Sequence, residues 1–112
     1  MTLLRLVFDR GADLNPIDGR VNVLLLGIAG GEHAGADLTD TILVLSFHAK
    51  NKTLSMISVP RDIWSDTLKD KINSAYHYGE EKGKSLPAGR QGGGLVLSKA
   101  IISDVVGLPI QY

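Results

Sequence analysis

The chain has 112 residues, with 12 basic and 12 acidic side chains and a formal net charge of zero. This length allows one small domain, and the balanced charge gives no global field that would draw the chain onto nucleic acid. Because cysteine is absent from the sequence, a disulfide framework and thiol chemistry are excluded. No apolar run reaches membrane-spanning length, so the chain by itself is predicted to be soluble.

The first half of the chain alternates turn signals with apolar runs. Residues 1–20 are predicted to be a linker or loosely attached arm, because they end in the turn cluster NPIDGR. VNVLLLG at 21–27 is typical of a buried strand. The glycine-rich segment 28–40 is a long loop, and loops of this length inside compact domains are usually functional or disordered.

Two β-rich runs, 41–48 and 53–60, predict a β-hairpin. The intervening AKNK is a suitable tip, with Asn51 able to take a left-handed turn conformation. Nearly every residue of both runs is apolar, so both faces of the sheet are expected to be covered by helices. Pro60 ends the second run.

Helical periodicity predicts two helices in the second half. Residues 71–81 place small or apolar side chains on one face, with Asp70 as the expected N-cap. Residues 95–107 form the second helix, with Gly107 as C-cap and an apolar stripe through Leu97, Ile101 and Val105. Residues 61–70 are expected to be a connecting loop.

These elements predict an α/β fold, layered α/β/α around a mixed sheet. The glycine-rich and proline-containing insert 82–94 separates the two helices. GLPIQY at 107–112 resembles the start of another strand with no stop signal after it. We therefore expect an incomplete domain.

The glycine-rich loop does not predict a nucleotide site. Position 29 is alanine, which breaks G-x-G-x-x-G, and Ala36 and Asp37 stand where a P-loop requires lysine and a hydroxyl. A strand-to-strand loop is the favoured interpretation, and an anion site made of backbone amides stays open.

Asp37 and Asp40 lie three residues apart just before the strand 41–48. One or two carboxylates with substrate phosphate are a usual way to hold Mg²⁺. Solvated loop acids are the other interpretation, and spacing alone favours it, more strongly for Asp37.

Hairpin geometry brings Asp40 close to Arg61. The strand 41–48 runs into the tip and 53–60 runs out of it, so Thr41 and Pro60 must lie at the same end of the sheet. A carboxylate beside a guanidinium is an arrangement that handles phosphoryl groups. A surface salt bridge is the alternative, and geometry gives the two equal weight.

Lys71 and Asn73 open the first predicted helix. Helix N-termini attract anions, and the loop 61–70 can fold back to the rim that holds Arg61. An ordinary polar first turn is the alternative interpretation.

In order and spacing, VNVLLLGIAGG, LTDTILVLSFHAKNKTLSMISVPRDIW, DKINSAYHYG and GLPIQY resemble the N-terminal half of one domain family. This is the LytR-CpsA-Psr domain, also called the cell envelope-related transcriptional attenuator domain. The resemblance covers residues 21–112 and is interrupted at 82–94.

The resemblance implies a bacterial phosphotransferase on the extracytoplasmic face of the cell membrane, held there by an N-terminal anchor that this chain lacks. Such enzymes move a glycopolymer from a polyprenyl-pyrophosphate carrier to peptidoglycan. The family fold is an α/β/α layered sheet with an apolar channel for the lipid tail. Its pyrophosphate is bound by arginines and by Mg²⁺ on aspartates.

The resemblance also implies roles for individual residues. Asp40 matches a metal-binding aspartate, and Arg61 matches an arginine that contacts phosphate. Asp62, the acid beside it, is expected to orient neighbouring groups in the catalytic site. Lys71 and Asn73 match the substrate-binding edge of the pocket.

Two departures from the family pattern follow the first strand. Ala29 and Gly31 stand where many relatives carry an aspartate and an arginine. Asp37 is therefore the expected replacement metal ligand.

Three functions are consistent with the sequence. The leading one is part of the phosphotransferase, with the 112 residues alone expected to be inactive. A non-catalytic module that binds polyprenyl phosphate is the second. A transcriptional regulator is the third, and the sequence argues against it because it has no basic stripe and no helix-turn-helix pair.

Overall fold

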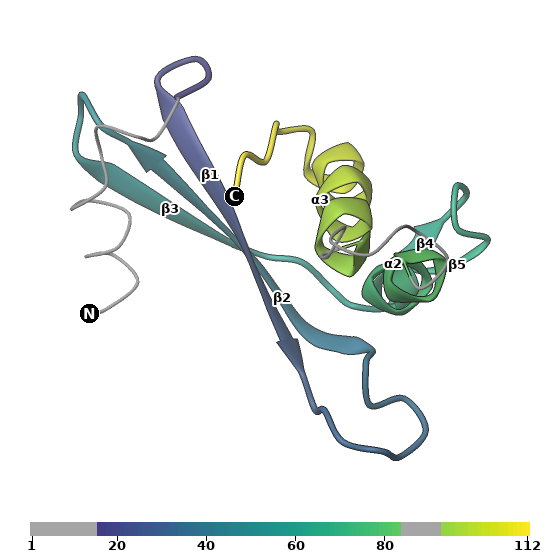
Figure 1. The fold of residues 1–112 in the computed structure, drawn as a ribbon. Coiled ribbons are helices and arrows are strands. Elements are labelled where there is room, and N and C mark those ends of the chain that lie inside the picture. Colours follow the sequence, from purple (N-terminus) through teal and green to yellow (C-terminus); the bar gives the residue numbers. More distant parts are fainter. Residues whose placement is uncertain (1–15, 84–92) are drawn as a thin grey trace.

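The computed structural model describes residues 16–83 and 93–112 (Figure 1). β1 (Arg20–Ile28), β2 (Thr39–His48) and β3 (Thr53–Ser58) form an antiparallel sheet in that order. A short ribbon, β4 (Trp64–Ser65) with β5 (Asp70–Lys71), leads to a 3₁₀ turn (Ile72–Ser74). Helices α2 (Ala75–Gly83) and α3 (Gly93–Val106) follow. Most of the predicted arm and of the predicted insert lie outside the described residues.

A tight reversal precedes β1. Asp18 and Gly19 both take positive φ, 52° and 77°, and the backbones of Ile17 and Arg20 bond across them. This pair of left-handed residues is the two-residue hairpin geometry. The turn predicted for NPIDGR is confirmed.

The hairpin of β2 and β3 is confirmed, with Leu43 opposite Ser58 and the Val59 N–H bonded to the Ile42 carbonyl. The left-handed residue at its tip is Lys52 (φ 52°), whereas the sequence suggested Asn51. The reason is local, because the Asn51 N–H donates to Nδ1 of His48 and the reversal passes to the next residue.

The last two residues run alongside β1 in the parallel sense. The Tyr112 N–H donates to the Asn22 carbonyl, and the Leu24 N–H donates to the Tyr112 carbonyl at 2.7 Å. This is the hydrogen-bond pattern of a parallel pair. Asn22, which is buried, adds a side-chain bond to the Pro109 carbonyl. The predicted mixed sheet and α/β class are confirmed.

Asp70 does not cap a helix. It belongs to β5, and its carboxylate accepts from the Lys71 N–H and from the Tyr78 hydroxyl. The helical segment starts two residues later as the 3₁₀ turn, whose N-cap Lys71 makes no side-chain capping bond. The prediction fails because the segment 61–70, expected to be a loop, forms the β4–β5 ribbon and draws Asp70 into it.

α3 ends as the sequence predicts. Gly107 takes φ 70° and its N–H bonds to the Ser103 carbonyl, which is the left-handed termination that favours glycine. Of the predicted stripe, Ile101 is buried and Leu97 packs against the core, whereas Val105 is 38% exposed. The buried face of the helix is thus rotated away from Val105.

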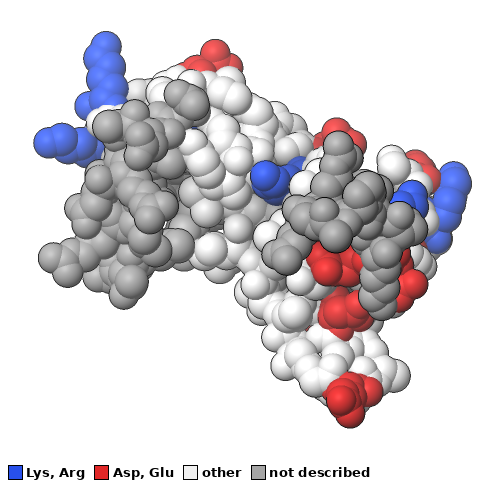
Figure 2. All heavy atoms as spheres, in the orientation of Figure 1, with Lys and Arg blue, Asp and Glu red and all other residues white. Residues whose placement is uncertain are grey.

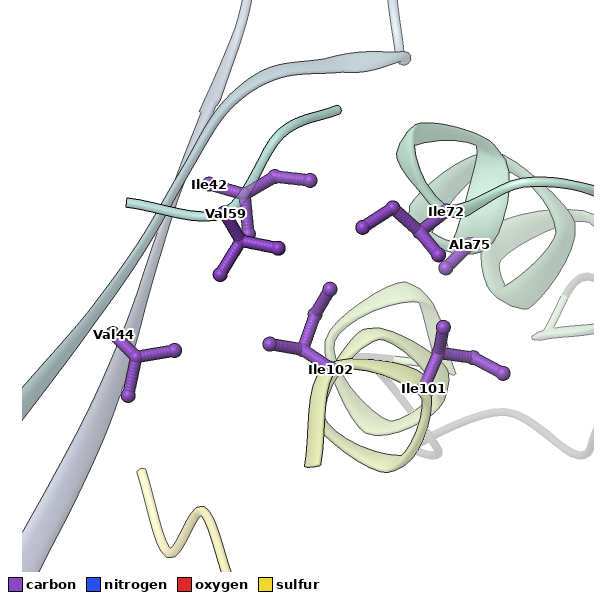
Figure 3. Close-up of a cluster of buried hydrophobic side chains, with 7 residues drawn as sticks. All are labelled: Ile42, Val44, Val59, Ile72, Ala75, Ile101 and Ile102. Atoms are coloured by element: carbon purple, nitrogen blue, oxygen red, sulfur yellow. The ribbon is translucent and has the colours of Figure 1, made fainter. Parts of the chain in front are cut away.

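The hydrophobic core lies between one face of the sheet and the helices (Figures 1 and 3). Its buried members come from β2, from the end of the hairpin, from the 3₁₀ turn and from both helices: Ile42, Val44, Val59, Ile72, Ala75, Ile101 and Ile102. The described residues thus supply two of the predicted layers. On β3, Leu54 and Met56 are exposed.

Two glycines let α2 and α3 approach each other closely. A Cβ on Gly79 would collide with the Gly93 carbonyl, and a Cβ on Gly94 would lie 2.7 Å from the Tyr76 ring. Both positions are buried in the structure. Only a residue without a side chain fits at each, so the separation of the helices depends on this pair.

We predict that Gly79→Ala destabilises the chain by about 2 kcal/mol, because overpacking outweighs the roughly 1 kcal/mol gained in helix propensity. Denaturant unfolding monitored by circular dichroism measures the change. Ala100→Gly at an exposed position of α3 is the control, with a loss of about 1 kcal/mol from propensity alone. A Gly79→Ala chain as stable as the parent would contradict the close packing.

Candidate functional site

An ion pair joins the two arms of the hairpin at its open end. Nη1 of Arg61 lies 2.8 Å from Oδ1 of Asp40, and the side chains are 52% and 50% exposed. The proximity predicted from hairpin geometry is confirmed. An exposed pair of this kind contributes about 0–1 kcal/mol, so the fold does not depend on it.

A buried set of backbone contacts fixes the position of this pair. The Thr39 hydroxyl donates to the Asn73 carbonyl at 3.2 Å, and the Asn73 N–H donates to the Arg61 carbonyl at 3.2 Å. The Ile72 N–H donates to the Ile63 carbonyl at 2.7 Å. Because these bonds tie the start of β2 to the segments around 61 and 72, the residues flanking Asp40 and Arg61 are held in register.

Asn73 takes part through its backbone. The residue is buried, at 9% exposure, and the hydrogen bonds above use its N–H and carbonyl. It therefore lies within the predicted site as a support for the chain segments around it.

Asp62 and Lys71 lie beside the ion pair of Arg61 and Asp40. Their charged groups are 3.6 Å apart and more than half exposed, and Lys71 is held in the ribbon opposite Trp64. The predicted residues at positions 40, 61, 62, 71 and 73 are thus brought together at one end of the sheet.

Asp37 contacts His77, a partly exposed residue of α2. Oδ2 of Asp37 lies 2.6 Å from Nδ1 of His77, and both side chains are about two-fifths exposed. His77 follows Asn73 by four residues, so it stands one helical turn beyond the backbone contact with Thr39. Sequence reasoning missed the pair because the two residues are 40 positions apart and no motif links them.

The glycine-rich loop closes on itself. The Gly30 N–H donates to the Ala36 carbonyl, and the N–H groups of Ala36 and Leu38 donate to carbonyls within the loop. Gly30, Gly31 and Gly35 take positive φ, which such tight turns require. These internal bonds engage three of the amides that an anion site in this loop would need.

Asp70 is the carboxylate with the clearest electrostatic perturbation. The Lys71 N–H, and then the Tyr78 hydroxyl, hold the pKa of Asp70 below its ordinary value of 3.8. The same bond to Asp70 raises the pKa of Tyr78. Tyr78 therefore stays a protonated donor, and Asp70 stays ionised beside Lys71.

The carboxylates of this region could supply only some of the ligands of a magnesium ion. Within residues 16–83 and 93–112, no group of three or more His, Cys, Asp or Glu side chains could hold a metal. Mg²⁺ commonly takes one or two protein carboxylates and completes its shell with water and phosphate oxygens. Asp40 and Asp37 offer that number of carboxylates, and each contacts a different partner: Oδ1 of Asp40 contacts Arg61, and Oδ2 of Asp37 contacts His77.

The comparisons with known proteins agree with the fold. The LytR_cpsA_psr family matches residues 9–112. Regulatory protein MsrR of Staphylococcus aureus (strain Mu50) is 43% identical over 68 residues, 58% of this chain and 20% of that protein. A Bacillus anthracis protein named polyisoprenyl-teichoic acid–peptidoglycan teichoic acid transferase TagU is 30% identical over 97 residues, 82% of this chain and 27% of that protein.

Among solved structures, the crystal structure of B. subtilis TagV aligns with a TM-score of 0.58 and 25% identity, covering 86% of this chain and 35% of that one. The chain thus spans between a fifth and about a quarter of the length of the relatives above. In the described part of the chain, neither helix has the length and apolar character needed to cross a membrane.

We predict that Thr39→Val destabilises the chain by about 1–2 kcal/mol, because the Asn73 carbonyl loses a buried hydrogen-bond donor at nearly unchanged volume. Thr41→Val is the matched control on the same strand, since Thr41 is exposed, and it should change stability by less than about 0.5 kcal/mol. Denaturant unfolding of both variants measures the difference. Equal losses of stability in the two variants would show that the buried hydrogen bond does not hold the site in place.

We predict that the pKa of Asp70, measured by NMR titration, lies below 3.8 and rises only partly in Tyr78→Phe, because the Lys71 N–H is the larger cause. A lowered carboxyl pKa stabilises the folded state above the unfolded pKa, and this contribution is lost as pH falls through the folded pKa. This contribution to stability is therefore lost below about pH 4. A full return to 3.8 in Tyr78→Phe would contradict the assigned order of causes.

Proposed function

This chain belongs to the LytR_cpsA_psr family, and on that premise we propose that it forms part of a phosphotransferase that passes a glycopolymer from a polyprenyl-pyrophosphate carrier to peptidoglycan. The observation that carries the proposal is the ion pair of Arg61 with Asp40 at the open end of the hairpin. The name of TagU, with teichoic acid as donor group and peptidoglycan as acceptor, supports the substrate class.

In the proposed reaction, Arg61 binds the pyrophosphate. The contact with Asp40 uses Nη1 alone, so the remaining guanidinium donors are available to phosphate oxygens, for which their forked geometry is suited. The side chain is half exposed, so an anion reaches it without opening the core. As the acceptor hydroxyl forms a phosphoester bond and the bond to the carrier phosphate breaks, Arg61 neutralises the charge on the leaving group.

The other residues of the rim assist this binding in the proposal. Lys71 adds a positive charge 3.6 Å from Asp62, which orients it. Asn73 holds the backbone of Arg61 in place. Asp40 and Asp37 would hold Mg²⁺, which neutralises phosphate charge when bound. The carrier is a membrane lipid, so we propose that the site works at the extracytoplasmic face of the membrane, next to an anchor.

A non-catalytic module that binds polyprenyl phosphate is the second candidate. Two observations favour it, namely alanine at position 29 and the engagement of Asp37 by His77. Both reduce the carboxylates available to a metal. Arg61 and Lys71 would then bind the phosphate without promoting transfer.

A regulatory function is the third candidate, since the S. aureus relative is named a regulatory protein. Direct DNA binding receives no support from the charge distribution. In Figure 2 the blue side chains lie in small separate groups on the visible face and form no continuous stripe. Nucleic-acid binding typically needs such a clustered basic surface.

We predict that Arg61→Ala in the full-length gene product lowers the rate of glycopolymer transfer from a lipid-linked donor by about 10²-fold, the effect of removing one charge-stabilising donor. Lys50→Ala, at the opposite end of the hairpin, is the control and should leave the rate unchanged. An unchanged rate in Arg61→Ala would remove this residue from the site.

Two further readouts separate the candidates. Binding of the lipid carrier without magnesium-dependent turnover would support the non-catalytic module. DNA binding that weakens steeply with salt would support a regulator.

A further inference from the structure

Trp64 forms one wall of a pocket between the β4–β5 ribbon and α3. The pocket has a volume of about 170 Å³, is open to solvent, and is lined by residues 64–67 and by Ile101, Asp104 and Val105 of α3. The indole of Trp64 is 59% exposed. A large aromatic side chain left open to solvent beside a pocket is unusual, since tryptophan is highly buried on average.

The ribbon holds the indole in this position. Trp64 pairs with Lys71 across the ribbon, and Ser65 is buried at 8% exposure. The Ser65 hydroxyl accepts from the Leu68 N–H, and its carbonyl accepts from the Lys69 N–H. These bonds close the turn of the ribbon, so the aromatic wall is built on a fixed backbone.

Two carboxylates face this pocket without partners. Asp66 and Asp104 line it from the ribbon and from α3. Neither carboxylate has an ion pair or hydrogen bond with another residue of the described chain. Among the residues that the structure describes, no lysine or arginine lines the pocket. The pocket therefore concentrates negative charge next to an aromatic face.

We propose that this pocket binds the methylated ammonium group of a small organic cation. The face of tryptophan is the strongest aromatic partner for a cation, and Asp66 and Asp104 supply the neutralising charge. Ile101 and Val105 provide an apolar wall for the methyl groups. An anion is repelled here, and a neutral sugar would leave both carboxylate charges uncompensated. The proposal does not depend on the phosphotransferase reaction.

The chain carries its own reporter, because Trp64 is its single tryptophan. Choline is titrated into the chain at constant ionic strength while the indole fluorescence is recorded. The neutral analogue 3,3-dimethylbutan-1-ol, in which carbon replaces the charged nitrogen, is titrated in parallel. We expect a saturable change with choline in the millimolar range, and binding of the neutral analogue at least about ten-fold weaker.

Isosteric variants test the carboxylates. Asp66→Asn and Asp104→Asn should each weaken choline binding about three-fold, the size of an exposed charge contact. Glu32→Gln removes one charge from the exposed glycine-rich loop and is the matched control, with unchanged affinity expected. Both aspartates are exposed, so an unchanged unfolding midpoint confirms that the variants fold.

Trp64→Leu tests the aromatic wall, with binding followed by the NMR linewidth of the choline methyl protons. A loss of at least about five-fold is expected. Equal affinity for choline and its neutral analogue would overturn the proposal, as would absence of saturation. Unchanged affinity in both aspartate variants, or saturation by a neutral oligosaccharide in place of choline, would also overturn it.

Discussion

The buried hydrogen bond from the Thr39 hydroxyl to the Asn73 carbonyl is the contact on which the arrangement of this region depends. Asn73 also bonds through its N–H to the Arg61 carbonyl, so one peptide segment fastens the start of β2 and the end of the hairpin. Thr39 is 2% exposed, and water cannot easily replace its hydroxyl. The polar groups at the surface are therefore positioned by a buried contact.

Stability therefore depends on the buried contacts, and the proposed binding chemistry depends on the exposed charged groups. The pair of Arg61 and Asp40 is half exposed, and pairs of this kind contribute little free energy. The guanidinium can therefore exchange part of its contact with Asp40 for a phosphate at small cost. A buried pair would resist such an exchange, because separating it leaves an uncompensated charge in the interior. In the proposed function, the site would therefore bind and release an anion while the backbone beneath it stays fixed.

The same division explains how far the sequence predicts the structure. Apolar runs and the turn signal between them specify the hairpin, and hairpin register is local, so the meeting of Asp40 with Arg61 follows without coordinates. The Asp37–His77 contact and the β4–β5 ribbon depend on how the segment 61–71 packs against the rest. Asp70 looked like a helix cap because its residue type fits one, and pairing in the ribbon overrode that preference.

The ribbon links the two proposed sites. Lys71, which lies beside the anion site, pairs directly with Trp64, which walls the pocket. Lys71 and Arg61 contribute positive charge on one side, and Asp66 and Asp104 leave negative charge on the other. At physiological ionic strength such fields decay over about 8 Å, and Lys71 lies directly opposite Trp64, so the charge of Lys71 acts on both proposed sites and is partly balanced by Asp62 at 3.6 Å.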